Sequence, residues 1–204
     1  MKITVIGSTS RIGRHLVADA RRRGHEIIAF TRRPHELPDG GILARVVTGD
    51  GRDPTAIAHA VDGADAVIAI VGAPSRKGPH ATADVARVVT HAMADAGVRR
   101  FVAPNPYPIV GNKPRLPLAV LRAIFSAAYA DAAEMERVVA ATDLDWTIAR
   151  LNRLLDKPPR GTATITRELL DDPRAITRAD AAATLLDLAE SDTFARTAVN
   201  VSGT

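Results

Sequence analysis

The sequence predicts an α/β fold in which a doubly wound parallel sheet carries helices on both faces. Short β-branched and apolar runs alternate along the chain with longer stretches in which apolar residues recur at helical spacing. The short runs are nearly continuous in apolar residues, as expected for strands that are buried on both faces of a parallel sheet. At 204 residues, without an internal repeat, we expect one domain over residues 1–204.

The predicted strands follow one another along the whole chain. They cover residues 2–6, 26–31, 44–47, 66–71, 100–103, 145–148 and 198–202. Helices are predicted between them wherever apolar residues lie three and four positions apart. These positions are Ile12, Leu16, Val17 and Ala20, then Ala81, Val85, Val88, Ala92 and Ala96, and then Ala133, Val138 and Ala141. We expect the strand order 3-2-1-4-5-6 with a late extra strand.

Two proline-bearing segments, residues 104–117 and 151–161, are predicted to be long loops after the fifth and sixth strands. The first carries five of the thirteen prolines, and proline favours extended and turn-like backbone. Ligands of open parallel sheets bind at the carboxyl ends of the strands. We therefore expect both segments to be substrate loops.

Two helix starts are marked by capping residues. Asp53 precedes Pro54 and is the expected N-cap of a helix after the third strand. Thr177 and Asp180 have the spacing of a capping box at the start of the last helix.

Composition limits the partners. The net charge is +4, but the arginines are spread along the chain and aromatic residues make up 3%, too few for base-stacking surfaces. We therefore do not expect nucleic acid as a partner. The six histidines lie in different predicted elements, so we expect no metal site.

Cysteine content and hydropathy indicate the compartment. The chain has no cysteine, which fits a reducing cytosol. It has neither an 18-residue apolar run nor a signal-like opening. We expect a soluble, cytoplasmic protein without a membrane segment.

The first strand ends in a turn that is typical of dinucleotide binding. The turn and the start of the following helix are Gly7, Ser8, Thr9, Ser10, Arg11, Ile12 and Gly13. Such turns need small residues because backbone N–H groups approach a pyrophosphate closely. With the spacing G-x-x-G-x-x-G the missing glycine is at Ser10, and with G-x-x-x-G-x-G it is at Arg11. The hydroxyls of residues 8–10 could donate to phosphate. Alternatively, Ser10 N-caps the helix and the turn holds no ligand.

The end of the second strand indicates which dinucleotide is bound. NAD-binding folds place a carboxylate there to accept from the ribose 2′-OH, whereas this chain has Arg32 and Arg33. Arginine binds phosphate with a bidentate fork. We therefore expect NADP(H) rather than NAD(H), with a solvated Arg33 as the alternative for that side chain.

Further residues are predicted to line the dinucleotide. Asp50 follows the third strand, where its carboxylate could accept from the adenine amino group, and Gly51 is next to it. Gly72 and Ala73 are small residues that leave room for the second ribose after the fourth strand. Pro104 follows the predicted fifth strand, at the edge of the sheet where ligands are expected.

The chain resembles the atypical short-chain dehydrogenase/reductase family, with its NmrA-like and flavin/biliverdin-reductase-like members. The matching stretches are "VIGSTSRIG", "GHEIIAFTRRP", "GDGRD", "VDGADAVIAIVGA", "VRRFV", "ERVVAATDLDWTIAR" and "ITRADAAATLLDLA", in the family's order over nearly the whole chain. The resemblance implies a Rossmann fold that binds NAD(P). It also implies that Arg32 and Arg33 bind the adenosine phosphate, and that residues 144–150 lead into the substrate loop.

Two departures concern catalysis. Many relatives place serines after "VRRFV", where this chain has Ala103, Pro104 and Asn105, and the Tyr-x-x-x-Lys pair of the wider superfamily is missing. The remaining candidates are Asn105 and Tyr107, expected to line the substrate pocket, and Tyr129, which packing explains equally well. Lys77 and Lys113 are the cations that could approach a tyrosine in space.

The resemblance favours an NADPH-dependent oxidoreductase that reduces a small carbonyl, quinone or flavin-like acceptor. The alternative is a non-catalytic NADP(H)-binding redox sensor. An epimerase or dehydratase is a weaker third, because it would normally keep the tyrosine and lysine. A small molecule is the expected substrate, and monomer and homodimer both remain open.

Overall fold

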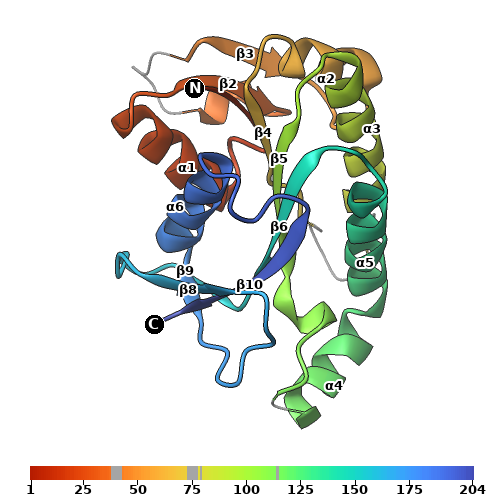
Figure 1. Cartoon of the computed structure of the whole chain (residues 1–204), viewed down its shortest axis with the longest axis vertical. Coiled ribbons are helices and arrows are strands. Elements are labelled where there is room, and N and C mark those ends of the chain that lie inside the picture. Colours follow the sequence, from red (N-terminus) through yellow and green to blue (C-terminus); the bar gives the residue numbers. More distant parts are fainter. Residues whose placement is uncertain (38–42, 73–77, 79, 114) are drawn as a thin grey trace.

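The computed structural model describes residues 1–37, 43–72, 78, 80–113 and 115–204 (Figure 1). The strands are β1 (Lys2–Ile6), β2 (Glu26–Thr31), β3 (Arg45–Thr48), β4 (Ala66–Ala69), β5 (Arg100–Pro106), β6 (Asp145–Leu151), β7 (Leu154–Leu155), β8 (Ala163–Thr166), β9 (Ile176–Thr177) and β10 (Thr197–Gly203). The helices are α1 (Arg11–Arg22), α2 (Pro54–Val61), α3 (Thr82–Asp95), α4 (Arg115–Ile124), α5 (Ser126–Ala140) and α6 (Arg178–Ala189), with 3-10 turns η1 (Pro34–Glu36) and η2 (Tyr107–Ile109).

Eight strands form the main sheet in the order β3-β2-β1-β4-β5-β6-β10-β8. All neighbours pair in parallel except β8, which is antiparallel to β10 at the edge. The predicted doubly wound parallel sheet and its order 3-2-1-4-5-6 are confirmed, with β10 as the late extra strand. The edge strand β8 was not predicted.

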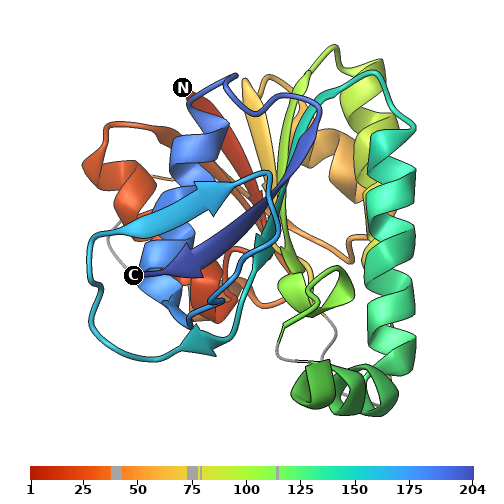
Figure 2. The ribbon, with the colours of Figure 1, turned by 60° about the horizontal axis from the view of Figure 1, so that its bottom comes forward.

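Helices cover both faces of the sheet. Figures 1 and 2 show α1 and α6 on one face and α2, α3 and α5 on the other. A core cluster that includes Leu16 and Leu185 lies under the first pair. A second cluster, with Ile57, Val89 and Met135, lies under the other three helices. Apolar burial on both faces explains why the central strands are continuous in apolar residues.

Strands β5 and β6 run further than predicted and correct the first loop boundary. β5 ends at Pro106 rather than residue 103, and β6 ends at Leu151 rather than residue 148. Pro104 pairs with Ala149, and Pro106 pairs with Leu151. Proline cannot donate to a ladder, so its presence argued against a strand, but its carbonyl still accepts.

The predicted loop at residues 104–117 also contains the start of a helix. The chain makes η2 at Tyr107–Ile109, and α4 begins at Arg115. Pro117 is therefore a residue of the first helical turn, where the N–H groups have no intrahelical partner and proline is tolerated. Pro114 lies outside the described residues. The segment is thus a strand end and a helix start joined by a short connection.

One helix cap is confirmed, and the other is corrected. The Asp53 carboxylate accepts from the backbone N–H groups of Thr55 and Ala56 and caps α2. Thr177 caps α6 by accepting from the Asp180 N–H. The Asp180 carboxylate does not complete the box, because it accepts instead from the Thr177 hydroxyl and from the N–H groups of Arg160 and Gly161.

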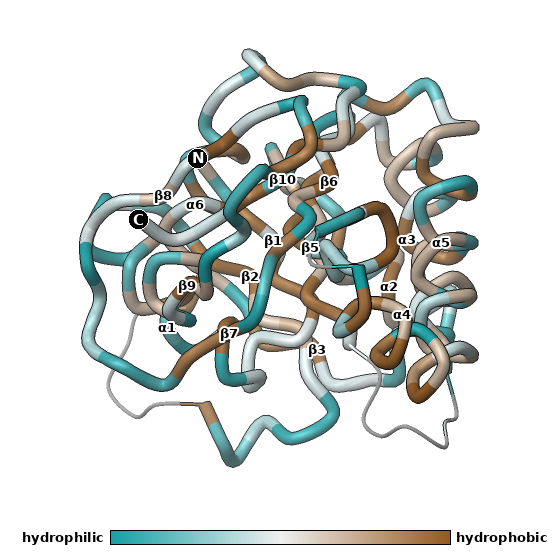
Figure 3. The backbone as a smooth tube through the Cα atoms, turned by 90° about the horizontal axis from the view of Figure 1, so that it is seen from below, coloured by the Kyte–Doolittle hydropathy of each residue, from teal (hydrophilic) through white to brown (hydrophobic). Residues whose placement is uncertain are grey.

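Helices α4 and α5 meet at a sharp bend. Among the described residues, no single helix is long and apolar enough to cross a membrane. These two helices pass that test of length and composition only as a pair, and the chain bends by 94° between them. Figure 2 shows α4 lying across the end of α5. The bend places α4 beside the carboxyl ends of β5 and β6, which Figure 3 shows from below.

Candidate functional site: two cavities that meet at the carboxyl edge of the sheet

The turn after β1 is built around two glycines. Gly7 has a φ of +83°, and a Cβ on it would lie 2.2 Å from the carbonyl oxygen of Ile70. A Cβ on Gly13 would lie 2.3 Å from the carbonyl oxygen of Gly7. Side chains are therefore excluded at both positions, which brings the N-terminus of α1 close to the end of β1. This close approach is what a bound pyrophosphate requires.

The hydroxyls of this turn have partners inside the protein. Ser8 is buried and donates to the carbonyl of Phe30 at 3.1 Å, and Thr9 bonds the Thr31 hydroxyl at 2.7 Å. The prediction that these two hydroxyls point to phosphate is therefore wrong. Ser10 accepts from the Gly13 N–H at 3.0 Å and caps α1, as the alternative predicted. Its own proton is left for another acceptor.

The side chains of Arg11 and Ile12 lie in different environments. The exposed guanidinium of Arg11 pairs with Asp156 at 2.8 Å and links α1 to the segment after β7. Its side chain therefore serves this link, and only its backbone N–H remains at the helix N-terminus. Ile12 is buried and lines the larger of the two cavities described below.

A polar cavity of about 250 Å³ opens beyond the turn. Its walls come from the ends of β1, β2, β3 and β4. They are formed by Ile6, Gly7, Thr9, Ser10, Phe30, Thr31, Arg32, Arg33, Gly49, Asp50, Gly51, Arg52, Ile70, Val71, Gly72, Ala81 and Val85. Eight of the residues predicted to bind a cofactor are thus brought together: Gly7, Thr9, Ser10, Arg32, Arg33, Asp50, Gly51 and Gly72.

Arg32 and Arg33 differ in how they are held. Within the described residues, the exposed guanidinium of Arg32 makes no ion pair and no hydrogen bond. Arg33 pairs with Glu36 at 2.7 Å, and the same carboxylate pairs with Arg14 at 2.6 Å. Arg32 is therefore the cation left for an anionic ligand, whereas Arg33 helps to fix the turn after β2.

Asp50 does not present a free carboxylate. Its two oxygens accept from the Nε and Nη2 of Arg52, each at 3.0 Å. The hydrogen bonds from Arg52 lower the pKa of Asp50 to about 2. The prediction that Asp50 is free to accept from an adenine amino group is corrected, because its oxygens hold Arg52.

Sequence reasoning missed Arg52. It lines the same cavity as Arg32 and brings a further cation to it. Its place two residues after Asp50, just beyond the third strand, was the available signal, because a carboxylate at that spacing folds back on a following arginine. Gly51, between them, leaves room for Val85, since a Cβ there would lie 3.0 Å from that side chain.

A second, largely apolar cavity of about 530 Å³ continues from the first. Its walls come from α1, β5, α4, α5 and the segment after β6. They are Ile12, Ile70, Val71, Gly72, Thr82, Pro104, Asn105, Pro106, Pro108, Leu121, Phe125, Ala128, Tyr129, Ala132, Leu151, Asn152, Arg153 and Leu154. Ile70, Val71 and Gly72 line both cavities, so the two meet at the end of β4. Pro104, predicted to bind the cofactor, lines this apolar cavity, and Ala73 falls outside the described residues.

Of the two candidate tyrosines, only Tyr129 lines the apolar cavity. Tyr107 is 1% exposed, and its hydroxyl accepts from the Leu170 N–H at 3.0 Å. It does not line the cavity, so the prediction that it faces the substrate is wrong. Tyr129 lines the cavity beside Phe125, with ring centroids 5.9 Å apart. Burial raises the pKa of Tyr129, so its hydroxyl is a weaker acid than that of an exposed tyrosine.

No lysine joins Tyr129 in the described part of the cavity wall. Lys113 pairs with Asp171 at 2.7 Å, which lowers the pKa of that carboxyl. Lys77 lies outside the described residues. The Tyr/Lys arrangement that lowers a tyrosine pKa is therefore absent from the described residues.

Asn105 lies at the cavity wall and is 5% exposed. Its Nδ2 donates to the Ala132 carbonyl at 3.1 Å and to Glu136 at 2.8 Å. Arg150 holds Glu136 with two hydrogen bonds of 2.9 and 2.6 Å. This polar network ties α5 to the ends of β5 and β6 beside an otherwise apolar cavity.

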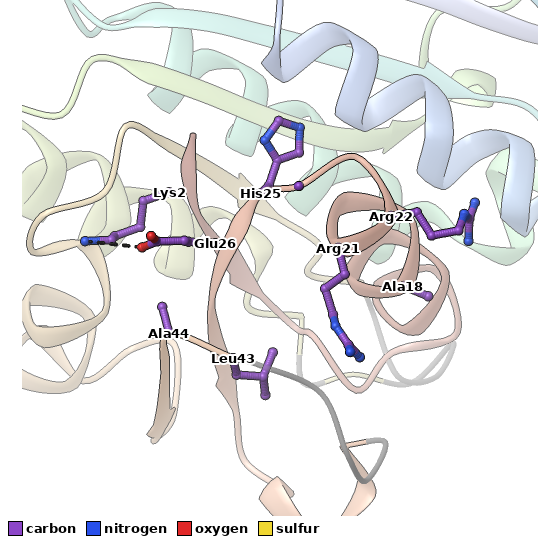
Figure 4. A pocket seen from close by; sticks show the side chains of 9 residues that line it. Lys2, Ala18, Arg21, Arg22, His25, Glu26, Leu43 and Ala44 are labelled. Atoms are coloured by element: carbon purple, nitrogen blue, oxygen red, sulfur yellow. Dashed lines mark ion pairs between the residues drawn. The ribbon is translucent and has the colours of Figure 1, made fainter.

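A wider hollow of about 1050 Å³ lies at the opposite end of the sheet, around the start of β1 and β2 (Figure 4). Lys2, Arg21, His25, Glu26 and Leu43 are among its walls, and Lys2 pairs with Glu26 at 3.7 Å. Its side chains are spread around an open surface (Figure 4). Because ligands of such sheets bind at the carboxyl edge, the two joined cavities are the candidate site.

Among known proteins, a curated relative and two solved structures are similar to this chain. The 3-diazoavenalumate denitrifying reductase of a Streptomyces species is 29% identical over 174 residues, which cover 76% of this chain and 56% of the relative. A short-chain dehydrogenase/reductase (wide type) from Veillonella parvula DSM 2008, solved in complex with NADP, superposes with a TM-score of 0.82 at 18% identity, covering 99% and 94% of the two chains. The anaerobillin reductase ChuY from Escherichia coli O157:H7 gives a TM-score of 0.81 at 19% identity, covering 99% and 97%.

These structures share the fold, and the chain spans little more than half the length of the curated reductase. A family model described as NAD(P)H-binding matches residues 7–192, from the glycine turn to the segment before β10. The glycine turn, the polar cavity and this match agree, and the chain belongs to the NAD(P)H-binding family.

Proposed function

We propose that the protein is an NADPH-dependent oxidoreductase of the atypical short-chain dehydrogenase/reductase type that reduces a small carbonyl, quinone or flavin-like acceptor. The observation that carries the proposal is the junction of the two cavities at Ile70, Val71 and Gly72. A dinucleotide lying along the polar cavity would direct its far end into the apolar one. That arrangement suits hydride transfer to a flat, apolar acceptor.

The charges of the polar cavity support NADPH over NADH. Arg32 is free within the described residues, and Arg52 is held beside it by Asp50. Arginine binds a 2′-phosphate through charge-assisted hydrogen bonds. The only carboxylate in the described cavity wall is that of Asp50, and Arg52 already engages it. A ribose 2′-OH would therefore find no free carboxylate among these residues.

The apolar cavity supports a planar acceptor. Bound NADPH supplies a hydride, and the acceptor must also gain a proton. Apolar walls, including Pro104, Leu121 and Phe125, would pack against the faces of a flat, apolar acceptor. Burial raises the pKa of Tyr129 and makes its hydroxyl a weaker acid. The hydroxyl would therefore donate a hydrogen bond to the acceptor oxygen, and the proton would come from solvent.

The relatives support the reaction class. The similar Streptomyces protein is named a denitrifying reductase, and ChuY is named an anaerobillin reductase. Because the chain spans 56% of the former and shares only the fold with the latter, the reaction is our proposal for this protein.

The test is a screen of NADPH oxidation. The purified protein is incubated with NADPH and, in turn, a quinone such as menadione, lumiflavin, or a small aldehyde, and loss of nicotinamide absorbance is followed. We expect turnover that depends on the acceptor. Tight NADPH binding without turnover on any acceptor would contradict the proposal.

A non-catalytic NADP(H) sensor is the second candidate. The observation that favours it is the separation of Tyr107 and Lys113 from the cavity, since Leu170 and Asp171 engage them. A sensor requires that the affinity for a protein partner change between NADPH and NADP⁺. No turnover in the screen, together with a partner affinity that differs between NADPH and NADP⁺, would favour the sensor over the oxidoreductase.

A further inference from the structure

The orientation of the Asn105 amide is fixed by its neighbours. Its Nδ2 faces the Ala132 carbonyl and the Glu136 carboxylate. A carbonyl oxygen can only accept, and the Glu136 oxygens face the Arg150 donors as acceptors. Only the NH₂ side of the amide can satisfy these two acceptors, so the assignment follows from chemistry.

The other side of the amide is therefore an acceptor without a partner. Among the described residues, no donor bonds Oδ1 of Asn105, although the residue is 5% exposed. Asn200 has an unpartnered Oδ1 that is sealed inside the protein, and the corresponding atom of Asn105 is not sealed. Since Asn105 lines the apolar cavity and its NH₂ group faces α5, we infer that its Oδ1 faces the cavity.

An unpaired acceptor in an apolar wall selects ligands that carry a donor. The same cavity offers a hydroxyl from Tyr129, which can both donate and accept, whereas Asn105 offers only an acceptor. A plain quinone has carbonyl oxygens and no N–H, so it leaves Oδ1 unpaired. A flavin imide or another cyclic lactam has an N–H beside its carbonyl and can satisfy it.

We propose that Asn105 is a specificity-determining residue whose Oδ1 accepts a hydrogen bond from an amide-type N–H of the bound ligand. The proposal rests on the proposed function, and it narrows the acceptor to flat heterocycles with a lactam or imide N–H. The same chemistry occurs in the carboxamide of nicotinamide. The experiment therefore has one arm for the acceptor and one for the cofactor.

The acceptor arm compares lumiflavin with 3-methyllumiflavin, which lacks the imide N–H. We expect the unmodified protein to favour lumiflavin by about three- to tenfold in affinity, the worth of one neutral hydrogen bond. The Asn105→Ala variant should lose this preference. Binding is read from flavin fluorescence, so this arm works even if no acceptor is reduced and the proposed function fails.

The cofactor arm compares NADPH with its 3-acetylpyridine analogue, which lacks the carboxamide N–H. If the carboxamide is the donor, the preference for NADPH should fall about three- to tenfold in Asn105→Ala. Loss of preference in either arm supports the proposal and identifies the donor.

Two controls separate recognition from folding. Asn112 is exposed and outside both cavity walls, so Asn112→Ala should keep both preferences. If Asn105→Ala does not fold, the same two ligand comparisons are made with Asn105→Ser and with the unmodified protein, and these still test whether Asn105 recognises the ligand N–H. Equal binding of both members of each ligand pair by the unmodified protein would overturn the proposal. Preferences that survive in a folded Asn105 variant would overturn it as well.

Discussion

The Ser10 hydroxyl accepts the backbone N–H of Gly13 at 3.0 Å and so caps α1 within the turn between Gly7 and Gly13. The serine that interrupts the glycine pattern thus stabilises the helix N-terminus. That N-terminus must remain open to an anion, because its N–H groups are the expected phosphate donors. The cap uses the Oγ lone pairs and leaves the hydroxyl proton free.

Replacement of Ser10 should therefore affect stability before binding. We expect Ser10→Ala to lower the free energy of unfolding by about 1 kcal/mol, and Ser10→Gly to lower it by a few tenths, as is usual for N-cap serines. Urea denaturation followed by circular dichroism measures both. Equal stability of the alanine variant and the unmodified protein would show that the cap contributes nothing. Weaker NADPH binding by Ser10→Ala than by the unmodified protein would show that the hydroxyl proton meets phosphate, whereas tighter binding by Ser10→Gly would show that the Cβ crowds the pyrophosphate.

Removal of the Arg32 guanidinium should weaken the binding of NADPH and not that of NADH. Because the Arg32 guanidinium lines the polar cavity and makes no hydrogen bond or ion pair within the described residues, we expect Arg32→Ala to weaken NADPH binding by about 1.5–3 kcal/mol, the worth of a hydrogen bond to a charged group. NADH binding should be nearly unchanged. Calorimetric titration with both nucleotides measures the difference.

Arg33→Ala is the matched control for Arg32→Ala. Arg33 lines the same cavity, but its guanidinium pairs with Glu36. Arg33→Ala should therefore weaken NADPH binding less than Arg32→Ala does. Equal or tighter binding of NADH by the unmodified protein would refute the assignment of Arg32 to a 2′-phosphate.

Two glycines of the site should differ sharply on substitution by alanine. A Cβ at Gly13 would lie 2.3 Å from the Gly7 carbonyl oxygen, whereas a Cβ at Gly72 meets no atom within 4 Å. We expect Gly13→Ala to lower the free energy of unfolding by about 1–3 kcal/mol or more, the scale of overpacking. Gly72→Ala should leave it unchanged. Thermal unfolding checks both, and equal losses would contradict the close packing of α1 on the turn.

The order of the central strands followed from sequence because apolar runs and helical spacing are local signals. Strands β1 and β2 match their predicted bounds. The end of β5 was missed because Pro104 and Pro106 cannot donate to the ladder, which argues against a strand although both residues pair with β6. Strands β7 and β9 have two residues each, too few for a period to be read.

The polar end of the site was more predictable than its apolar end. Arg32 and the glycines follow directly after strands, so the topology fixes their place. Tyr107 and Asn105 lie two residues apart in one segment, and yet the first bonds Leu170 in the interior and the second lines the cavity. Their contacts with Leu170 and with α5 are long-range, and nothing in the local pattern distinguishes them.

Asp180 should make stability depend on acid. The carboxylate accepts from the N–H groups of Arg160 and Gly161, each at 2.9 Å, and from the Thr177 hydroxyl at 2.7 Å. Burial opposes ionisation, but these hydrogen bonds prevail and lower the pKa of Asp180. Below the ordinary aspartate pKa of about 3.9, the unfolded chain therefore binds more protons than the folded one. The stabilisation by Asp180 is complete above that pH and is lost as the pH falls through the lowered value.

Asp180→Asn removes this contribution. An amide NH₂ in place of one oxygen would face a backbone N–H donor, so we expect a loss of about 1–3 kcal/mol at pH 7. The difference from the unmodified protein should shrink as the pH falls below about 4, where the unfolded chain takes up the proton before the folded one does. Urea unfolding of both proteins at a series of pH values isolates Asp180, because other acids such as Asp50 and Asp145, with lowered pKa values, are common to both. A difference that stays constant down to pH 3 would mean that the ionised form of Asp180 does not hold the segment at Arg160 and Gly161.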